Sequence, residues 1–209
     1  MAINGPNGPI DPGSMNPEIM QSLPPEAMSS CTAGDMQQMP PPCMGGCNSG
    51  HITHMPPEAM GGMDAPMMQM MPPEAMGGMD AQMMQMMPPG CMEGMSPEMM
   101  RMMPPEAMAG MDADMIANMP PEAMAGMNAD MMANIPPEAM AGISPEMVEN
   151  MPPEAMSSMS PEMMQNMPPE AQDAVSEASD GGLGALDEAL KPPPTDGEPS
   201  SIRSSADAL

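Results

Sequence analysis

Residues 15–174 are built from twenty consecutive copies of one eight-residue unit, and no insertion or deletion interrupts the series. The unit is plainest at Met103–Gly110 (MPPEAMAG), Met119–Gly126 (MPPEAMAG) and Ile135–Gly142 (IPPEAMAG). A period this short means that one small structural element is used over and over. The repeat therefore constrains the architecture of the chain much more closely than its activity.

Apolar residues occupy three positions of each octad. Position 1 is Met or another aliphatic residue in most copies, and position 6 is nearly always Met. Position 5 alternates between Ala and Met through most of the array, as at Ala107, Met115, Ala123 and Met131. The alternation makes the true repeat sixteen residues long, with two octads that differ in packing depth.

Polar and proline residues supply a start signal and a stop signal for a helix inside each octad. Ser144–Glu146 and Asp112–Asp114 are typical of a helix N-cap followed by the first turn, with an acid where the helix dipole favours it. Gly or Asn at position 8, as at Gly110 and Asn118, tolerates the left-handed conformation that ends many helices. Because the prolines prevent a helix from running on, we predict about one and a half helical turns over positions 3 to 7, followed by an extended link.

These patterns predict an all-α fold, a thin α-solenoid of very short helices, one per eight residues, with a methionine seam inside and carboxylates outside. The chain has 42 Met and no Phe, Tyr or Trp, so its core is expected to be soft. An isolated octad cannot fold, and stacking or association with another chain must stabilise it. Substantial disorder of the isolated chain is the competing expectation.

The chain outside the repeat forms two further segments. Residues 1–14 are rich in Gly, Pro and Asn and are expected to be a flexible lead. Residues 175–209 are expected to be an acidic, mostly disordered tail. Within that tail, Leu183, Leu186 and Leu190 predict a short amphipathic turn over residues 183–190, which caps the solenoid or docks on a partner.

The charge of the chain argues against several classes of partner. The formal net charge is −26, and the only basic residues are Arg101, Lys191 and Arg203. With no basic stripe and no aromatic residue for base stacking, nucleic acid is not an expected partner, and anionic membranes should repel the chain. No apolar run is long enough to span a membrane, and the N-terminus shows no secretory signal. We expect a protein partner or self-association, and the compartment stays open.

The octads Ile135–Gly142 (IPPEAMAG) and Ile143–Asn150 (ISPEMVEN) resemble the apolar–Ser/Thr–Pro–Glu repeat arrays of large bacterial, algal and viral surface or adhesin-like proteins. The resemblance covers residues 15–174 and implies an extended scaffold or adhesive element, with no catalytic residues. It also suggests the cell surface, the extracellular space or a virion as the location. This chain departs from such arrays in having Met where they usually carry Leu, Ile or Phe.

The sharpest candidate for a chemical site is a cluster of thiols and imidazoles in a Gly-rich stretch, formed by Cys43, Cys47, His51 and His54. Soft sulfur and imidazole ligands together suit Cu(I) or Zn(II), although the spacing is not a standard zinc signature. The competing interpretation is structural, because Cys43 and His51 fall at position 5 and Cys47 at position 1. All three therefore replace core residues in frame.

Clusters of methionines such as Met67–Met71 also resemble thioether sites for Cu(I) or Ag(I), although the period alone explains nearly every Met. No nucleophile elbow, phosphate loop or acid–base pair is visible, so we do not expect an enzyme. The leading hypothesis is a non-enzymatic structural or interaction repeat protein. The alternative is a Met-, Cys- and His-rich protein that binds or sequesters a soft metal.

Overall fold

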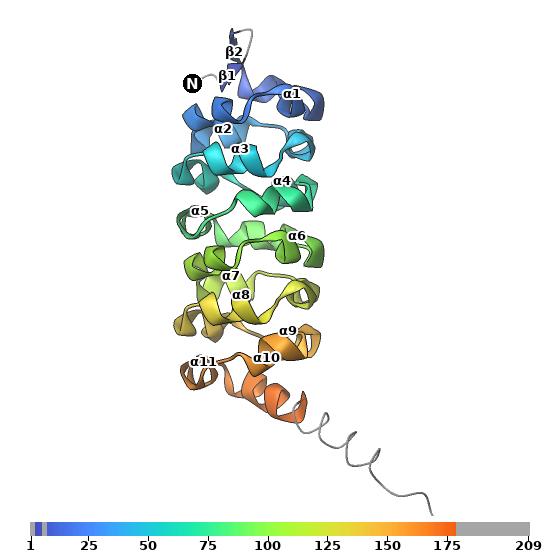
Figure 1. The fold of residues 1–209 in the computed structure, drawn as a ribbon, viewed down its shortest axis with the longest axis vertical. Coiled ribbons are helices and arrows are strands. Elements are labelled where there is room, and N and C mark those ends of the chain that lie inside the picture. Colours follow the sequence, from blue (N-terminus) through green and yellow to red (C-terminus); the bar gives the residue numbers. More distant parts are fainter. Residues whose placement is uncertain (1–2, 6–7, 179–209) are drawn as a thin grey trace, which may run out of the picture.

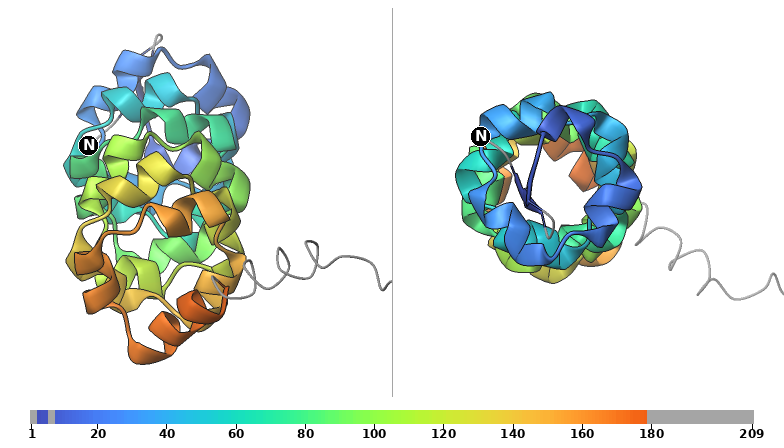
Figure 2. Two further views of the ribbon diagram at one scale, coloured as in Figure 1. Left: turned by 60° about the horizontal axis from the view of Figure 1, so that its bottom comes forward. Right: turned by 90° about the horizontal axis from the view of Figure 1, so that it is seen from above.

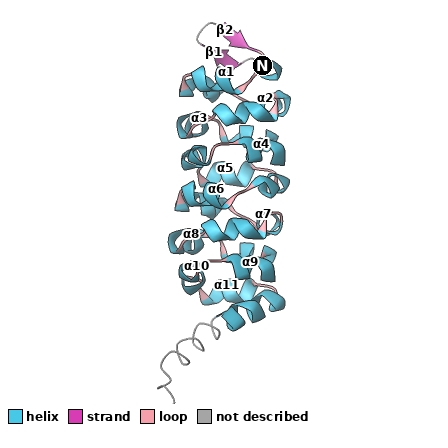
Figure 3. Ribbon diagram, turned by 90° about the vertical axis from the view of Figure 1, so that its right-hand side faces the viewer, coloured by secondary structure: helices cyan, strands magenta, loops and turns pink. Residues whose placement is uncertain are grey.

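The computed structural model describes residues 3–5 and 8–178 of the 209-residue chain. The helices form a tall, narrow column that extends steadily away from the N-terminal end (Figure 1). Short helices are separated by extended links at the octad boundaries, and the only strands drawn lie at the N-terminal end (Figure 3). The prediction of an all-α solenoid with one very short helix per octad is confirmed.

The helices are of two kinds that alternate along the chain. The α-helices are α1 (Pro17–Ser22), α2 (Ala33–Gln38), α3 (Ser49–His54), α4 (Ala65–Met70), α5 (Ala81–Met86), α6 (Pro97–Met102), α7 (Ala113–Ala117), α8 (Ala129–Asn134), α9 (Pro145–Asn150), α10 (Pro153–Ser157) and α11 (Pro161–Asn166). The 3-10 helices are η1 (Pro12–Ser14), η2 (Pro25–Ser30), η3 (Pro41–Gly46), η4 (Pro57–Gly62), η5 (Pro73–Gly78), η6 (Pro89–Gly94), η7 (Pro105–Gly110), η8 (Pro121–Gly126) and η9 (Pro137–Gly142). Residues 169–178 are also helical.

The residue at position 2 correlates with the kind of helix, through the hydrogen bonds of the first turn. In α4, the side chain of Asp64 accepts the Met67 N–H at 2.8 Å, so the Asp64 carbonyl is left to accept the Met68 N–H at 3.0 Å. In η5, Pro72 has no side-chain acceptor, and its carbonyl accepts the N–H of Ala75 at 2.9 Å. A polar cap therefore gives an α-helical first turn, and a proline cap favours the tighter 3-10 turn.

Each turn of the solenoid contains three octads. Helices pack on one another when their first residues are 24 residues apart, as α4 does on η3 and η6, and α5 on η4 and η7. Seen from one end, the chain traces a ring, and successive turns of the ring lie on top of one another (Figure 2). Because three is odd and the two kinds of octad alternate, most α-helices stack between 3-10 helices.

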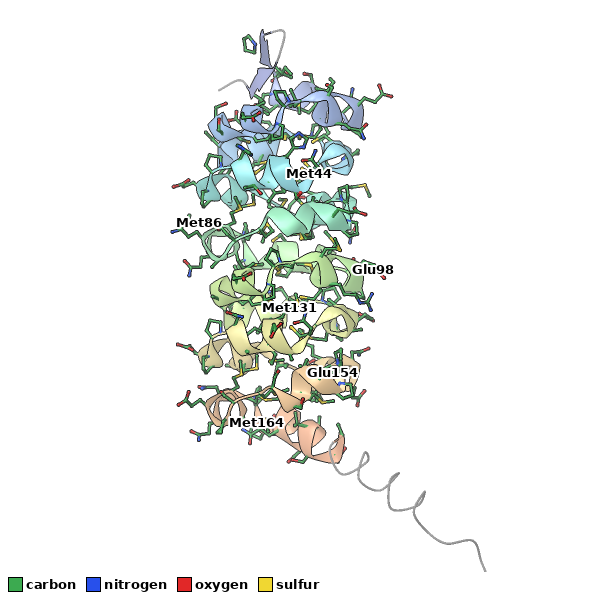
Figure 4. The ribbon with its side chains drawn as sticks, in the orientation of Figure 1. Met44, Met86, Glu98, Met131, Glu154 and Met164 are labelled. Carbon is green, nitrogen blue, oxygen red and sulfur yellow. The ribbon has the colours of Figure 1, made fainter. Side chains whose placement is uncertain are left out.

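The core is one continuous column of side chains inside this ring. The apolar residues at positions 1, 5 and 6 are buried in nearly every octad, as Met124, Met127 and Met131 show. Met44 and Met131 are fully buried in the column, whereas Glu98 and Glu154 are exposed on its outside (Figure 4). Position 4 is exposed in every octad except at Gly50, which is half-buried, so the carboxylates lie on the outer surface, as the sequence predicts.

The role predicted for position 8 is wrong. Among the described residues, Gly8 alone has a positive φ, at 120°, so no helix ends in the left-handed conformation. Glycine at position 8 instead lets a 3-10 helix approach the α-helix of the preceding turn. A Cβ atom on Gly126 would lie 2.7 Å from the Cβ of Met100 and would collide with the carbonyl oxygen of Pro97. Asparagine at this position has another function, since Asn118 Nδ2 donates to the Asp114 carbonyl at 2.7 Å.

Two Pro-Pro octads near the C-terminal end support this explanation of the glycines. They carry Ser158 and Ala174 at position 8, and both are α-helical rather than 3-10 helical. Each has an earlier turn beneath it, and a side chain at position 8 rules out the closest approach. A proline cap therefore permits the 3-10 helix. Wherever such a helix has an earlier turn below it, a glycine at position 8 makes the close contact with that turn.

The described part of the N-terminal lead is folded, in contrast to the flexible segment expected over residues 1–14. Strands β1 (Ile3–Gly5) and β2 (Gly8–Ile10) pair antiparallel and lie across the end of the ring (Figure 2). Ile3 is fully buried and β1 contacts η2, so the hairpin covers the first turn of the core. The amphipathic turn predicted over residues 183–190 lies outside the described residues.

Candidate metal centre and outer surface

His51 lies in α3 at position 5 of its octad, which faces the core, and both of its ring nitrogens make hydrogen bonds. Nδ1 accepts the backbone N–H of Asn48 at 3.2 Å, so Nε2 carries the proton and donates it to the Leu23 carbonyl at 3.0 Å. The Asn48 side chain in turn accepts the His51 N–H at 3.0 Å, which completes a capping box. His51 is fully buried and joins two turns of the solenoid, which is a structural role.

The other three candidate ligands occupy different surroundings. His54 is exposed at the end of α3, where its Nδ1 lies 2.9 Å from the Gly50 carbonyl. Cys43 is buried in η3, and Cys47 is buried at the junction between η3 and α3. Cys31, which the cluster proposed from sequence did not include, is buried close enough to Cys47 to raise its pKa, and Cys43 in turn raises the pKa of Cys31.

Burial keeps these thiols in the protonated form. It raises the pKa of Cys43 to about 11 and, with neighbouring thiols adding to the effect, that of Cys47 to about 12. The pKa of Cys31 rises to about 12, mainly by burial and also because of Asp35. Because a thiol binds a metal as the thiolate, these environments oppose metal binding near neutral pH.

The structure does not bring the four candidate residues together as a metal centre. Within residues 3–5 and 8–178, no group of three or more His, Cys, Asp or Glu side chains is arranged to hold a metal ion. The nitrogens of His51 are already occupied, and His54 faces solvent while the cysteines face the core. Cys43, Cys47 and His51 are therefore better described as residues that occupy core positions of the octad than as metal ligands.

The methionine cluster at residues 67–71 is divided between the inside and the outside of the solenoid. Met67, Met68 and Met71 are buried in the core, whereas Met70 at the end of α4 is 48% exposed. Its counterparts Met86 and Met102 are each 46% exposed. The run of thioethers seen in the sequence therefore does not converge on one site.

Asp35 is a buried polar residue that the sequence analysis overlooked. It occupies position 5 of α2, the slot that His51 takes in α3, and the hydroxyl of Thr32 donates to its carboxylate at 2.6 Å. Burial by itself would raise the pKa of Asp35, but hydrogen bonds, including those from Thr32, lower it below its usual value. The Thr-x-x-Asp spacing of a capping box was the signal that could have identified it.

The outer surface is divided into three rows, because the side chains at any one octad position recur on the same side every 24 residues. One row, which we call the glutamate row, carries Glu74, Glu98, Glu122, Glu146 and Glu170 at position 4 of five successive turns. Another, the interrupted row, has Pro42, Pro66 and Gly90 at the same position in three successive turns, between Glu18 and Asp114. The octad pattern alone does not show this difference, because it requires the number of octads per turn.

Positive charge on this surface is sparse in the described part of the chain. Arg101 lies beside the glutamate row, with Nη1 3.7 Å from the Glu98 carboxylate and Nη2 donating to the Ala125 carbonyl at 3.3 Å. Both side chains of this ion pair are mostly exposed, so water screens the attraction between them. The remaining carboxylates of the glutamate row keep their negative charge exposed to solvent.

Comparisons with known proteins do not assign this chain to a family. No family model matches it, and no curated protein or solved structure matches it either. Separately, none of the helices in the described residues has the length and apolarity needed to cross a membrane.

Proposed function

We propose that this chain is a non-enzymatic repeat scaffold that binds a protein partner through its outer surface. The observation that carries the proposal is the separation of roles within each octad. Positions 1, 5 and 6 form the closed core, whereas position 4 is exposed in every turn and is usually acidic. The apolar side chains pack between turns inside the solenoid, and the variable residues at positions 4 and 7 mostly face outward.

The charge of the surface supports a cationic partner. With a net charge of −26, two copies of this chain repel each other unless an uncharged face is used. The glutamate row presents a carboxylate on each of five successive turns, and a basic segment lying along the column can contact several of them together. Each exposed contact is weak, so an elongated partner gains affinity by making many of them.

The soft-metal alternative has less support. It rests on the number of sulfur atoms, yet nearly all of the described thioethers are buried in the core and the thiols have raised pKa values. Binding at Cys43 and Cys47 would require loss of their protons and displacement of packed side chains. Titration of the full chain with Cu(I) tests this directly, because tight stoichiometric binding that is lost on Cys43→Ser and Cys47→Ser would restore the alternative.

Binding of a synthetic lysine-rich peptide tests the proposed interaction surface. We would compare the natural chain with a variant carrying Glu74→Gln, Glu98→Gln, Glu122→Gln and Glu146→Gln. The matched control removes four charges from the interrupted row, on either side of its uncharged residues. The changes are Glu18→Gln, Asp114→Asn, Glu138→Gln and Glu162→Gln. Both variants lose four negative charges at exposed sites, and both should keep the helical signal in circular dichroism.

Affinity for the peptide should fall at least about tenfold in the glutamate-row variant, and more at low salt than at high salt. The control should lose less affinity, because only Asp114, Glu138 and Glu162 are on consecutive turns, and the uncharged residues Pro42, Pro66 and Gly90 separate Glu18 from them. Equal losses in the two variants would mean that net charge alone attracts the peptide. No measurable binding by the natural chain would contradict a cationic partner.

A further inference from the structure

Three methionines of this chain are on its outer surface, in contrast to the many that are buried in its core. Met70, Met86 and Met102 are 48%, 46% and 46% exposed and are the large apolar residues that the described surface exposes most. All three occupy position 8 at the ends of α4, α5 and α6, on three different sides of the column. Met86 can be seen on the outside of the column in Figure 4.

The position that these methionines share is filled by polar side chains in the other octads that have a polar cap. The equivalent residues there are Ser22, Gln38, His54, Asn118, Asn134, Asn150 and Asn166. Most of these donate a hydrogen bond to the carbonyl four residues earlier, as Asn134 does to Asp130 at 2.8 Å and Asn150 does to Glu146 at 2.8 Å. The fold therefore accommodates a polar group at the end of these helices without any change in packing.

We propose that Met70, Met86 and Met102 are sulfoxidation sites, at which peroxide modifies the chain without unfolding it. In this step a lone pair of the thioether sulfur attacks one oxygen of hydrogen peroxide and an S=O bond forms. The O–O bond breaks, and the departing hydroxide takes the remaining proton and leaves as water. The sulfur loses two electrons to the peroxide. The product is methionine sulfoxide, which reductases can return to the thioether.

The buried methionines respond differently to the same reagent. Met68, Met84 and Met100, two residues before the three surface methionines, are fully buried in the core. Peroxide reaches them only when the fold opens, and a sulfoxide there would place a polar group in an apolar column without a partner. Each α-helix from α4 to α6 thus carries one exposed, reactive methionine and two buried, protected methionines on the same short segment.

Peroxide treatment of the full chain, followed by peptide mapping, tests the proposal. Met70, Met86 and Met102 should take up oxygen at least about tenfold faster than Met68, Met84 and Met100. At the point where the three surface sites are fully oxidised, the circular dichroism spectrum and the unfolding midpoint should be unchanged. Uptake at equal rates in the surface and buried sets would overturn the proposal, as would loss of helical signal when only the surface set is oxidised.

A variant with Met70→Gln, Met86→Gln and Met102→Gln provides the control, because Gln38 already occupies the same position in α2. It should fold as the natural chain does and should lose the fast phase of oxygen uptake from residues 8–178. Retention of a fast phase of the same size in that part of the chain would show that the reactive sulfurs lie elsewhere.

Discussion

The Pro-Pro octads and the polar-capped octads differ at three positions. Where an octad of one kind packs on an octad of the other kind in the next turn, these differences complement each other. A polar-capped octad has an acceptor at position 2 and usually a large residue at position 5, and it forms an α-helix. A Pro-Pro octad has a proline cap, usually Ala at position 5 and usually Gly at position 8, and it mostly forms a 3-10 helix. The narrower helix and the glycine give room to the α-helix beneath. The pair of octads, rather than the single octad, is therefore the unit that packs.

The largest expected effect comes from truncation at position 5, where the two kinds of octad differ in side-chain size. Met131→Ala in α8 should destabilise the chain by about 3 kcal/mol, because it removes buried atoms and leaves a cavity. Cys91→Ala in η6 should cost less than about 1 kcal/mol, because most 3-10 octads already carry Ala there. Urea unfolding followed by circular dichroism measures both. If the two variants lost similar free energies of unfolding, position 5 would be filled equally in the two kinds of octad.

The next largest effect concerns the glycine contact. Gly126→Ala should destabilise the chain by about 2 kcal/mol, because the new Cβ cannot fit beside Met100 without displacing η8. Gly90→Ala, at the exposed position 4 of the Pro-Pro octad 87–94, is the control, since no atom lies within 4 Å of the position that its Cβ would take. That change should be neutral or slightly stabilising. If both variants unfold at the same urea concentration, the close approach is not what selects glycine.

A smaller effect is expected from the side-chain cap. Asp112→Ala should cost about 1 kcal/mol, because the Met115 N–H loses the carboxylate that accepts it at 2.8 Å. Asp114→Ala removes the same charge two residues later, where the side chain is exposed and makes no cap, and it should cost less. Hydrogen exchange at the Met115 amide should accelerate only in the first variant. Acceleration in both would indicate a general effect of charge.

The smallest effect on stability near neutral pH is expected from ionisation of the buried thiols. This effect grows only at alkaline pH. Burial raises the pKa of Cys91 to about 12 from an unfolded value of 9.0. Stability from this thiol is therefore fully present below pH 9 and is lost as the pH rises toward 12. The unfolding midpoint should fall less steeply in Cys91→Ala than in the natural chain over that range. Identical slopes would show that Cys91 is accessible to water in the folded state.

The octad pattern was sufficient to predict the helices and the core, because each octad contains its own start signal and its own apolar face. Pro72, Ala75 and Met76 alone identify where η5 begins and which side of it is buried. The sequence did not reveal that η5 is a 3-10 helix. That outcome depends on the missing acceptor at Pro72 and on the contact that Gly78 makes with the preceding turn.

Predictions that needed the number of octads per turn could not be made from the sequence. The close approach of Gly126 to Pro97 and the alignment of Glu98 with Glu122 both depend on a separation that the octad does not encode. The Cys43, Cys47, His51 and His54 cluster illustrates the converse. Proximity along the chain suggested a site, but His54 faces outward and the other three side chains face the core.

A turn of three octads combined with a repeat of two also restricts how such a chain can change in length. Loss of a single octad would bring octads of the same kind face to face at each contact spanning the deletion, so that two narrow Pro-Pro octads would meet at some contacts and two larger polar-capped octads at others. Loss of two adjacent octads leaves every remaining helix opposite its proper kind. Tandem duplication and deletion in the gene should therefore be tolerated in steps of sixteen codons, and single-octad events should appear mainly at the ends of the array.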